Sequence, residues 1–571
     1  MKNAEIAAAF DELATLYELD GVVVYRVLAY RNAAKAIRDS GVSVAELARQ
    51  GRAQELSGIG KTIAEKIQAL LLEGEIPAAR KLKEHIPQGL VEVTRIPGLG
   101  PKRARLLHDE LGVETIDQLR EAAESERIRS VPGFGPKAEE NILASLAAGA
   151  GGRERVLLST ALEIGQELVE GLRAHGCAKR VELAGSARRW ADACKDLDVV
   201  AATDDPQALA DAFAALAPID EVSTSGTAGA RAVTHQGMAV DLRIVPEESF
   251  GNLLQHFTGS GRHNEALRTA AVKRGLHVSE YGILDDATGE TYKAETEEEV
   301  YARLGMAYVE PELRENRGEL EAARDGALPD LVTLEDIRGD LHCHTVASDG
   351  HATVLEMARA AQERGYEYLA ITDHSASHGF GNDVSPDELR RQIERVAAAN
   401  EQLDDFTVLA GSEVNISPDG SLDYADDLLA QLDWIVASVH TSFRMSEQEM
   451  TDRMVTAIEN PLVDAIGHPT GRLIGRREPY ALDLDRVVEA AARTGTFLEI
   501  NSNPNRRDLS DVHARAAVEA GVKLVIDSDA HRPSTLAVMR YGIATARRAW
   551  VTRDDVVNSR PWSDVLALRR R

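Results

Sequence analysis

Two aspartates, Asp196 and Asp198, stand one residue apart in the short apolar run KDLDVV (195–200). Because side chains alternate along a strand, both carboxylates are expected on one face. A third carboxylate, Asp241, interrupts the apolar run MAVDLRIV (238–245). Three carboxylates on neighbouring strands suit two divalent cations about 3.5–4 Å apart, one activating a hydroxyl and the other holding phosphates. The pattern therefore predicts a Mg²⁺ or Mn²⁺ site for nucleotidyl transfer.

A Gly-Ser turn precedes the aspartate pair in the segment GSARRWADAC (185–194). Its backbone N–H groups and the hydroxyl of Ser186 can bind a triphosphate, and the Arg189 guanidinium can neutralise the phosphate charge. An Asp-x-Asp pair by itself is most often an exposed turn or a strand edge. Turn, arginine and third carboxylate together favour a site that acts on the α-phosphate of a nucleotide.

The region after residue 340 repeats apolar strand, polar terminus and helix, with seven such strands. This alternation indicates a parallel sheet, here expected to close into a barrel. A βα barrel keeps its functional residues at the C-terminal strand ends, and each of the seven strands ends in His, Asp, Glu or Asn. The candidate ligands at or beyond these ends are His342, His344, Asp349, His374, Glu413, His440, His468, Asp529 and His531.

Imidazoles and carboxylates that converge from several strands are a ligand set for Mn²⁺, Zn²⁺ or Fe²⁺. The set exceeds the need of one ion, so we expect two or three ions that share Glu413. The segment HPTGRLIGRREP (468–479) offers Arg472, Arg476 and Arg477 as phosphate-binding residues. The histidines left unassigned are His351, His378 and His513.

A turn of the form apolar, Gly, apolar, Gly precedes a helix three times, in LSGIGKTIAEKI (56–67), IPGLGPKRARLL (96–107) and VPGFGPKAEENI (131–142). Such turns leave N–H groups free at a helix N-terminus, where phosphate binds. Repeated as helix-hairpin-helix units, they grip a DNA backbone without reading bases. A single turn is often an ordinary helix boundary, and the third is also compatible with a structural role. The glycines expected at DNA phosphates are Gly58, Gly60, Gly98, Gly100, Gly133 and Gly135.

Composition bounds the remaining possibilities. The 571 residues, 44% apolar and 28% charged, are typical of several globular domains. Residues 1–150 hold 20 Lys and Arg against 22 Asp and Glu, so nearly all of the net charge of −28 lies beyond them, and DNA must be held by local contacts. Three scattered cysteines do not make a disulfide framework. No apolar run approaches the roughly 18 residues of a membrane span, and the N-terminus lacks signal-peptide features, so a cytoplasmic location is expected.

The polymerase motifs resemble family X DNA polymerases, the group that includes the gap-filling polymerase beta. The match extends over HFTGSGRHNEALRTAAVKRG (256–275), which is similar to the family's sugar-gate segment and the helix after it. The resemblance implies that Phe257 and Gly259 lie beside the incoming sugar. It also implies that Asn264 reaches the minor-groove edge of the base and that Arg268 contacts the templating strand.

Two positions qualify what this resemblance implies. The family has an aromatic residue where this chain has His256, which leaves exclusion of ribonucleotides open. The first hairpin resembles the lyase domain of polymerase beta, so the resemblance aligns Lys66 with a Schiff-base lysine and Tyr30 with a supporting tyrosine. A Schiff base needs a neutral amine, and an ordinary solvated lysine is the alternative. Weak 5′-deoxyribose-phosphate lyase activity is predicted.

The histidine-rich region resembles the polymerase and histidinol phosphatase (PHP) family, with all nine ligand positions filled, which implies metal-dependent hydrolysis of phosphate esters. The order of hairpin domain, X-type polymerase and PHP barrel is similar to that of the bacterial and archaeal PolX group. That resemblance implies gap filling in base excision repair on gapped or primed DNA with dNTPs, and a 3′→5′ exonuclease in the barrel. Mg²⁺ or Mn²⁺ is expected at the polymerase site and Mn²⁺ and/or Zn²⁺ in the barrel, in a nucleoid-associated monomer.

The expected fold is multidomain, with an all-α helix-hairpin-helix N-terminal domain, an α+β X-family nucleotidyltransferase palm and thumb, and a C-terminal α/β PHP (β/α)7 barrel. The expected boundaries are 1–85 for a helical domain similar to the small N-terminal domain of polymerase beta, 86–153 for a fingers-like helix-hairpin-helix domain, 154–250 for the palm, 251–320 for the thumb, 321–338 for a linker and 339–571 for the barrel.

Two alternatives remain. In the first, the barrel is a structural or DNA-clamping module whose metals only hold the fold, although a structural zinc site needs only about four closed ligands. In the second, the barrel acts on a small phosphomonoester and the transferase on a substrate without a template. Asn264, Arg268 and the three turns favour a template.

Overall fold

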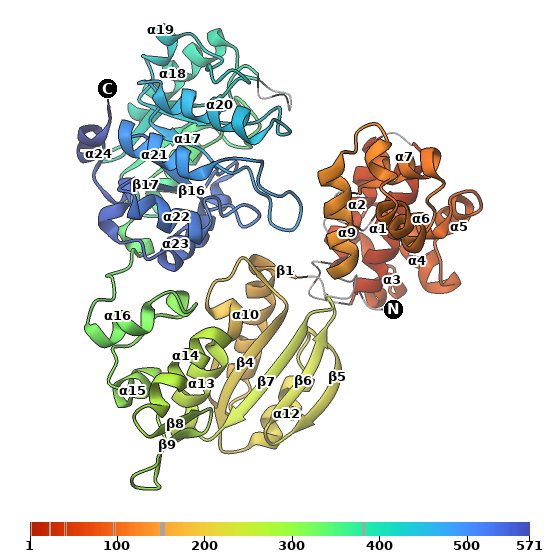
Figure 1. The fold of residues 1–571 in the computed structure, drawn as a ribbon, viewed down its shortest axis with the longest axis vertical. Coiled ribbons are helices and arrows are strands. Elements are labelled where there is room, and N and C mark those ends of the chain that lie inside the picture. The colour runs from red at the N-terminus through yellow and green to blue at the C-terminus, as the bar shows by residue number, and fades with distance from the viewer. Residues whose placement is uncertain are drawn as a thin grey trace. The chain divides into compact units, whose positions relative to one another are not determined.

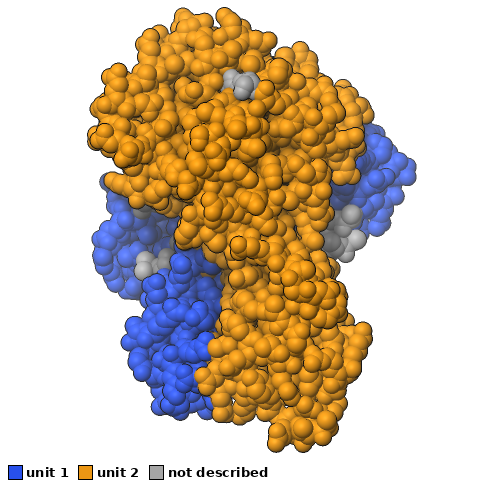
Figure 2. Space-filling view, turned by 90° about the vertical axis from the view of Figure 1, so that its left-hand side faces the viewer, with its two compact units in different colours: residues 1–156, 162–183, 195–247 blue, residues 157–161, 184–194, 248–571 orange. Residues whose placement is uncertain are grey.

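The computed structural model describes the chain except residues 2, 22–23, 39, 41–42, 57, 95, 97–98, 149–154, 378, 380–382 and 571. Gly98 and His378 therefore lie outside the described residues, as does most of the glycine-rich segment 149–155. Two compact units are distinguished in Figure 2. The first comprises residues 1–156, 162–183 and 195–247, and the second comprises residues 157–161, 184–194 and 248–571. In the described part of the chain, no helix is long and apolar enough to cross a membrane.

Short helices around one apolar core form residues 3–148, as the repeated turns predict (Figure 1). Phe10, Leu16 and Leu107 are among its fully buried side chains. The helices are α1 (Asn3–Leu19), α2 (Val24–Arg38), α3 (Val44–Arg49), α4 (Lys61–Glu73), α5 (Pro77–Lys83), α6 (Gln88–Val93), α7 (Pro101–Leu111), α8 (Ile116–Glu124) and α9 (Pro136–Ala148).

A mixed five-stranded sheet completes the first unit, with strand order β2-β4-β7-β6-β5. Only β4 and β7 run parallel among these neighbours, and their register places Asp198 opposite Asp241. The elements of residues 156–245 are β1 (Val156–Leu157), α10 (Leu158–Ala174), β2 (Ala178–Leu183), α11 (Gly185–Arg188), β3 (Ala193–Cys194), β4 (Asp196–Thr203), α12 (Pro206–Ala214), β5 (Ile219–Gly226), β6 (Gly229–Thr234) and β7 (Ala239–Val245). Of these, α11 and β3 belong to the second unit.

Helices and a small three-stranded sheet occupy residues 250–325 of the second unit. Leu267, Ile283 and Tyr301 are fully buried there and belong to one apolar cluster. The elements are α13 (Phe250–Thr258), α14 (Gly261–Val272), β8 (Leu276–Ser279), β9 (Gly282–Asp285), β10 (Thr291–Tyr292), α15 (Glu297–Arg303), η4 (Pro311–Leu313) and α16 (Glu319–Asp325).

Residues 339–568 of the second unit form the expected barrel, whose seven parallel strands follow one another in sequence order. A parallel bridge between Cys343 and Ala530 brings the last strand back to the first, so the barrel is nearly closed. The strands are β11 (Gly339–Cys343), β12 (Tyr368–Ile371), β13 (Thr407–Asn415), β14 (Trp434–Ser438), β15 (Ala465–Ile466), β16 (Phe497–Asn501) and β17 (Leu524–Asp527). The helices are α17 (Val354–Glu363), α18 (Pro386–Asn400), α19 (Asp426–Leu429), α20 (Glu447–Glu459), α21 (Leu484–Thr494), α22 (Asp511–Glu519), α23 (Met539–Arg548) and α24 (Trp562–Leu568).

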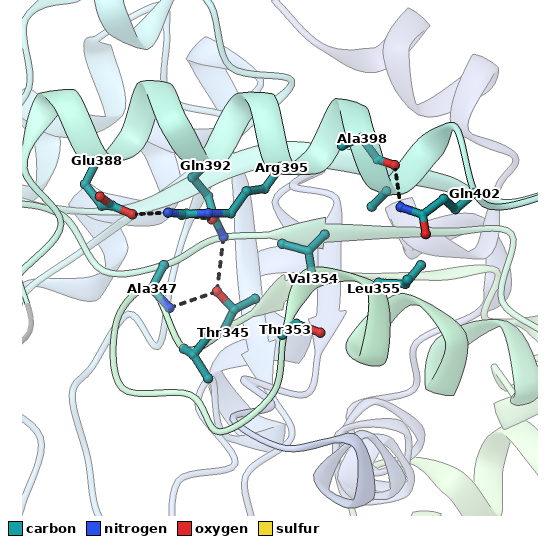
Figure 3. A pocket seen from close by; sticks show the side chains of 12 residues that line it. Thr345, Ala347, Thr353, Val354, Leu355, Glu388, Gln392, Arg395, Ala398 and Gln402 are labelled. Carbon is teal, nitrogen blue, oxygen red and sulfur yellow. Dashed lines mark hydrogen bonds and ion pairs between the residues drawn. The ribbon is translucent and has the colours of Figure 1, made fainter.

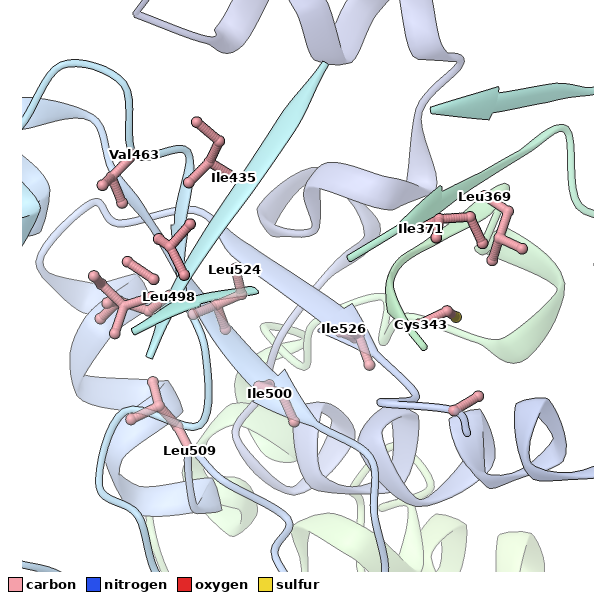
Figure 4. Close-up of a cluster of buried hydrophobic side chains, with 14 of the residues drawn as sticks. Cys343, Leu369, Ile371, Ile435, Val463, Leu498, Ile500, Leu509, Leu524 and Ile526 are labelled. Carbon is pink, nitrogen blue, oxygen red and sulfur yellow. The ribbon is translucent and has the colours of Figure 1, made fainter. Parts of the chain in front are cut away.

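Alternation along the strands divides the barrel's apolar side chains into two clusters. One face carries residues such as Leu498 and Ile526, which pack in the larger cluster of Figure 4. The other face carries Trp434, Phe497 and Val525. The Trp434 and Phe497 rings, from strands that are not neighbours, stack 6.0 Å apart. Each of the seven strands contributes at least one side chain to this second cluster, so it fills the interior of the barrel.

Candidate active sites

The carboxylate of Glu413, on β13, is the centre of the histidine cluster and is only 1% exposed. His374 Nδ1 lies 2.8 Å from one of its oxygens, and His342 Nε2 lies 3.4 Å from the same atom. His468 Nε2 and His440 Nε2 lie 2.9 and 3.1 Å from the other oxygen. These four imidazoles come from different strand ends, so the barrel itself brings them together.

The remaining predicted ligands extend the same cluster. His344 Nε2 lies 3.2 Å from Asp529, and His531 Nε2 lies 3.2 Å from Asp349. Three groups each bring their ligand atoms within 4.8 Å of one another: His344, Asp349, His374 and His531; His342, His344 and Asp529; and His374, Glu413 and His440. All nine predicted residues thus lie at one end of the barrel.

The donors in this cluster suit divalent ions. Within the described residues, both nitrogens of His344, Nε2 of His342 and Oε2 of Glu413 are buried without a hydrogen-bond partner, which is costly unless a ligand such as a metal satisfies them. His468 and Asp529 also have positive φ angles, 30° and 54°. Such backbone strain is retained mainly where a functional geometry requires it.

Burial and neighbouring charges shift the imidazole pKa values in opposite directions. Burial lowers the pKa of His344 to about 3 and that of His468 to about 4. Burial also acts on His374, but the adjacent carboxylates of Glu413 and Asp349 outweigh it and raise that pKa to about 10. Metals bind the neutral imidazole, so an ion bound here would take the place of the proton on His374.

Glu499 on β16 is a functional candidate that the sequence reasoning missed. One of its oxygens lies 2.6 Å from His342 Nδ1, and the other accepts a hydrogen bond from the backbone N–H of His468. Because a carboxylate accepts, Nδ1 carries the proton and Nε2 is left for a metal. The signal was a lone acid inside the apolar run FLEIN (497–501).

A pocket of about 430 Å³ is lined by residues of the segment 345–355, which follows the ligand His344, and by residues of helix α18 (Figure 3). In it, Gln392 donates to Thr345 Oγ1 at 3.1 Å and to Asp373 at 2.6 Å. Asp373 also accepts the backbone N–H of Thr345 at 2.7 Å. Since Thr345 and Asp373 adjoin the ligands His344 and His374, this network fixes the positions of both ligands.

The arginines predicted to bind phosphate are placed differently. Arg472 Nη1 lies 2.8 Å from Asp192 Oδ2, and Arg477 donates to a main-chain carbonyl at 2.8 Å. Arg476 is exposed. Arg472 therefore ties the segment after the Gly-Ser turn to the barrel.

Two further contacts reinforce this connection. Arg507 Nη1 donates to the carbonyl of Trp190 at 2.9 Å and lies 3.2 Å from Asp192 Oδ1. The Trp190 ring meets Tyr541 edge-on, with centroids 5.8 Å apart.

Arg506 is better placed than these residues to bind phosphate. Its Nε lies 4.0 Å from Oδ2 of the ligand Asp529. Its Nη1 is buried and has no hydrogen-bond partner within the described part of the chain. An arginine with an unused donor beside a metal cluster can bind a phosphate oxygen.

On the other sheet, β4 and β7 bring together the three carboxylates predicted to serve nucleotidyl transfer. Asp198 pairs in register with Asp241, and Asp196 stands two residues earlier on the same face. Asp196 is exposed and the other two are half-buried, so these acids are more open than their apolar context indicated. Arg243 and Arg231 lie 3.0 and 3.4 Å from Asp241 Oδ2 and offset part of the negative charge.

The Gly-Ser turn and the sugar-gate segment meet in the second unit. Arg188 donates to Thr258 Oγ1 and Arg189 to the Thr258 carbonyl, both at 2.6 Å. Ser186 is half-buried on α11. Gly259 has φ of 68°, and a Cβ there would lie 3.3 Å from Arg189 Nη1. Glycine thus permits the close approach of the two segments.

Only some of the remaining sugar-gate residues are exposed enough to contact a nucleotide or a template strand. Asn264 is 8% exposed, donates to the His256 carbonyl at 2.7 Å and accepts from Gln255 at 2.9 Å. It must exchange these partners to reach a base. Phe257 is half-buried, whereas Arg268 is exposed on α14 and open to a template strand.

In the first unit, Lys66 Nζ lies 5.9 Å from the centre of the Tyr30 ring, and burial raises the pKa of that tyrosine. The described turn glycines lie at or just before helix N-termini. Gly60 and Gly100 are the N-caps of α4 and α7, and neither helix has a side-chain cap. Gly58 and Gly133 have φ near +87° and +86°, and Gly135 directly precedes α9.

A sheet that carries three carboxylates has the features of a nucleotidyltransferase, and a barrel with nine clustered ligands has those of a metal-dependent phosphoesterase. Family models match accordingly: a helix-hairpin-helix domain at 1–76, a SAM-like helix-hairpin-helix tandem at 90–148, the DNA polymerase beta thumb at 253–315 and a PHP domain at 340–503.

A match over the whole chain identifies the family more closely than these separate domain matches. The chain is 39% identical over 573 residues to the DNA polymerase/3'-5' exonuclease PolX of Bacillus subtilis (strain 168), covering 100% of both chains. The chain therefore belongs to the PolX family, and the predicted resemblance and fold class are confirmed. The barrel region is also 33% identical over 239 residues to a probable phosphatase of Thermoanaerobacter sp. (strain X514), covering 38% of this chain and 89% of the relative. A probable phosphatase of Caldanaerobacter subterraneus is 35% identical over 204 residues, covering 34% of this chain and 75% of the relative.

Proposed function

We propose that the chain is a template-directed DNA polymerase that fills short gaps during base excision repair, and that its barrel is a 3′→5′ exonuclease. The Bacillus relative bears both activities in its name and matches the whole chain. The two helix-hairpin-helix matches support DNA as the partner.

The observation that supports the synthetic activity is the parallel register of Asp198 with Asp241. Asp196, Asp198 and Asp241 would hold Mg²⁺ or Mn²⁺, which when bound lowers the pKa of the attacking hydroxyl and stabilises phosphate charge. Ser186 and Arg189 orient the triphosphate. Asp196 is exposed and Asp198 and Asp241 are half-buried, so solvent-borne substrates have access to these carboxylates.

Asp198→Asn tests this assignment. We expect loss of nucleotide addition to a one-nucleotide-gapped duplex, with nuclease activity retained. Asp204→Asn is the matched control, because Asp204 follows the same strand but its salt bridge is with the exposed Lys179 at 2.8 Å. Loss of both activities in Asp198→Asn would contradict two independent sites.

The convergence of four imidazoles on Glu413 supports the hydrolytic activity. The cluster would hold Mn²⁺ and/or Zn²⁺, which when bound activates water and polarises the phosphate. Glu499 keeps His342 in the tautomer that binds metal, and Arg506 binds the scissile phosphate. These contacts favour catalysis over a purely structural metal site.

His344→Ala separates those two roles. We expect lost nuclease activity, normal melting and intact synthesis. His351→Ala is the matched control, since His351 is exposed and outside the ligand set. Global destabilisation by His344→Ala would instead support a structural barrel.

A phosphomonoesterase is the second candidate for the barrel, because relatives that match it alone are named probable phosphatases. Release of nucleotides from a primed duplex is compared with hydrolysis of p-nitrophenyl phosphate. Preference for the small ester would favour this candidate.

The contact of Lys66 with Tyr30 supports weak deoxyribose-phosphate lyase activity. Borohydride should trap a covalent adduct with an abasic substrate, and Lys66→Ala should abolish it. Lys61→Ala, on the exposed start of the same helix, is the control. An adduct that persists in Lys66→Ala would overturn the assignment.

A further inference from the structure

Glu315, between η4 and α16, places one carboxylate oxygen against two arginines. Arg189 Nε donates to Oε1 at 3.1 Å, and Arg548 Nη1 donates to the same atom at 3.0 Å. Arg189 belongs to the turn proposed to bind the triphosphate, whereas Arg548 ends α23 of the barrel. One carboxylate therefore connects the nucleotide-binding turn with the barrel.

The contact with Glu315 occupies a donor that a triphosphate would use. Arginine binds phosphate most strongly through two parallel N–H groups. Because Arg189 Nε already donates to Glu315, the edge that Nε shares with Nη2 is not open to phosphate oxygens. Glu315 also cancels the positive charge that attracts the phosphates.

The preceding arginine, Arg188, makes a different kind of contact. It lies 2.6 Å from Glu297, whose carboxylate is 3% exposed and also pairs with the fully buried Arg314. Breaking such a buried pair leaves an uncompensated charge and is strongly unfavourable. Glu315 is 21% exposed, so its pair with Arg189 is the one that can exchange.

Arg548 lowers the cost of replacing Glu315 by a phosphate as the partner of Arg189. Its Nη2 lies 3.0 Å from Asp511, and its Nη1 also donates to the Arg189 carbonyl at 2.7 Å, so its position does not depend on Glu315. When the Arg189 side chain turns toward a phosphate, it also gives up its hydrogen bond to the Thr258 carbonyl, but Glu315 keeps Arg548 as a counter-ion. No partly buried carboxylate is then left without a cation.

We propose that Glu315 is an internal competitor of the triphosphate for Arg189, and that Arg548 retains Glu315 when a nucleotide displaces it. The proposal rests on the proposed role of Arg189. It makes Glu315 a residue that sets the KM for the incoming dNTP, and it makes that KM depend on an arginine of the barrel.

Glu315→Gln tests the competition, because it removes the charge and keeps the shape. We expect the KM for dNTP in single-nucleotide incorporation to fall roughly fivefold, with kcat unchanged. Glu312→Gln is the matched control: Glu312 lies in the same region and pairs with Arg547 of the same helix α23 at 2.8 Å. Its KM should equal that of the parent enzyme.

Arg548→Gln should change KM in the opposite direction, because Glu315 then depends on Arg189 for its counter-charge. The double variant Glu315→Gln/Arg548→Gln should return to the KM of Glu315→Gln. If Glu315→Gln loses stability on heating, Glu315→Asp, which shortens the reach and keeps the charge, should lower KM instead.

Arg189→Gln separates this proposal from the one on which it rests. If Arg189→Gln leaves KM unchanged, Arg189 does not bind the triphosphate. If Arg189→Gln raises KM while neither Glu315 variant lowers it, the internal competitor alone is refuted.

Discussion

Glu499→Gln is the sharpest test of the barrel chemistry, because it changes one buried oxygen and no ligand. The carboxylate lies 2.6 Å from His342 Nδ1 and fixes the proton on that nitrogen. A charge-assisted hydrogen bond of this kind contributes about 1.5–3 kcal/mol, which corresponds to roughly 10–100-fold in metal affinity. An amide can also donate to Nδ1, which would move the proton to Nε2 and block that ligand.

Bound metal is measured by elemental analysis after dialysis against graded Mn²⁺, and nuclease activity is measured on the same samples. Synthesis on a primed template should stay unchanged. Glu367→Gln is the control, because Glu367 makes an exposed pair with Arg338 at 2.8 Å. Burial raises the pKa of Glu499 because a buried charge is costly, and the neutral amide avoids that cost. Parent-like metal content in Glu499→Gln would refute the orienting role.

Three further predictions concern the barrel. Arg506→Gln should lower nuclease activity by about 10-fold or more through a lost charge-assisted phosphate contact, with metal content unchanged; reduced metal content would argue for a different role. Trp434→Ala should reduce the free energy of unfolding by about 3–5 kcal/mol, because the ring is fully buried and stacks on Phe497, and urea denaturation measures it. A chelator should abolish the nuclease activity of the parent enzyme and leave its melting temperature near that of His344→Ala; a large fall in the melting temperature would favour a structural role for the ions.

The ligand cluster was predictable because a parallel barrel collects the C-terminal ends of its strands at one rim. His342, Glu413 and Asp529 are far apart in the chain, yet strand position alone implied that they meet. The Asp198–Asp241 pair was predictable for a related reason, since both acids interrupt apolar strands. A local sequence pattern is enough to predict such a site when the fold fixes which strand ends lie together.

The hydrogen-bond and ion-pair partners of individual polar side chains were not predictable from the sequence. The sequence indicates Arg472 as a phosphate-binding residue, but in the structure it pairs with Asp192, which precedes it by 280 residues. Arg506, which the sequence reasoning did not name, lies beside the ligand Asp529 instead. The same limit applies to Asn264, whose amide is already bonded to His256 and Gln255. Pairing depends on long-range packing that neither spacing nor composition records.

The contacts between the barrel and residues 190–192 limit how the barrel of this enzyme can be exchanged for another in a chimeric protein. Arg472 and Arg507 hold the Trp190 carbonyl and the Asp192 carboxylate. In a chimera with a foreign barrel, Trp190 and Asp192 would lose the residues that they contact, Tyr541, Arg472 and Arg507. A barrel graft must therefore carry residues 190–192 with it, although they precede the barrel by more than a hundred residues in the chain.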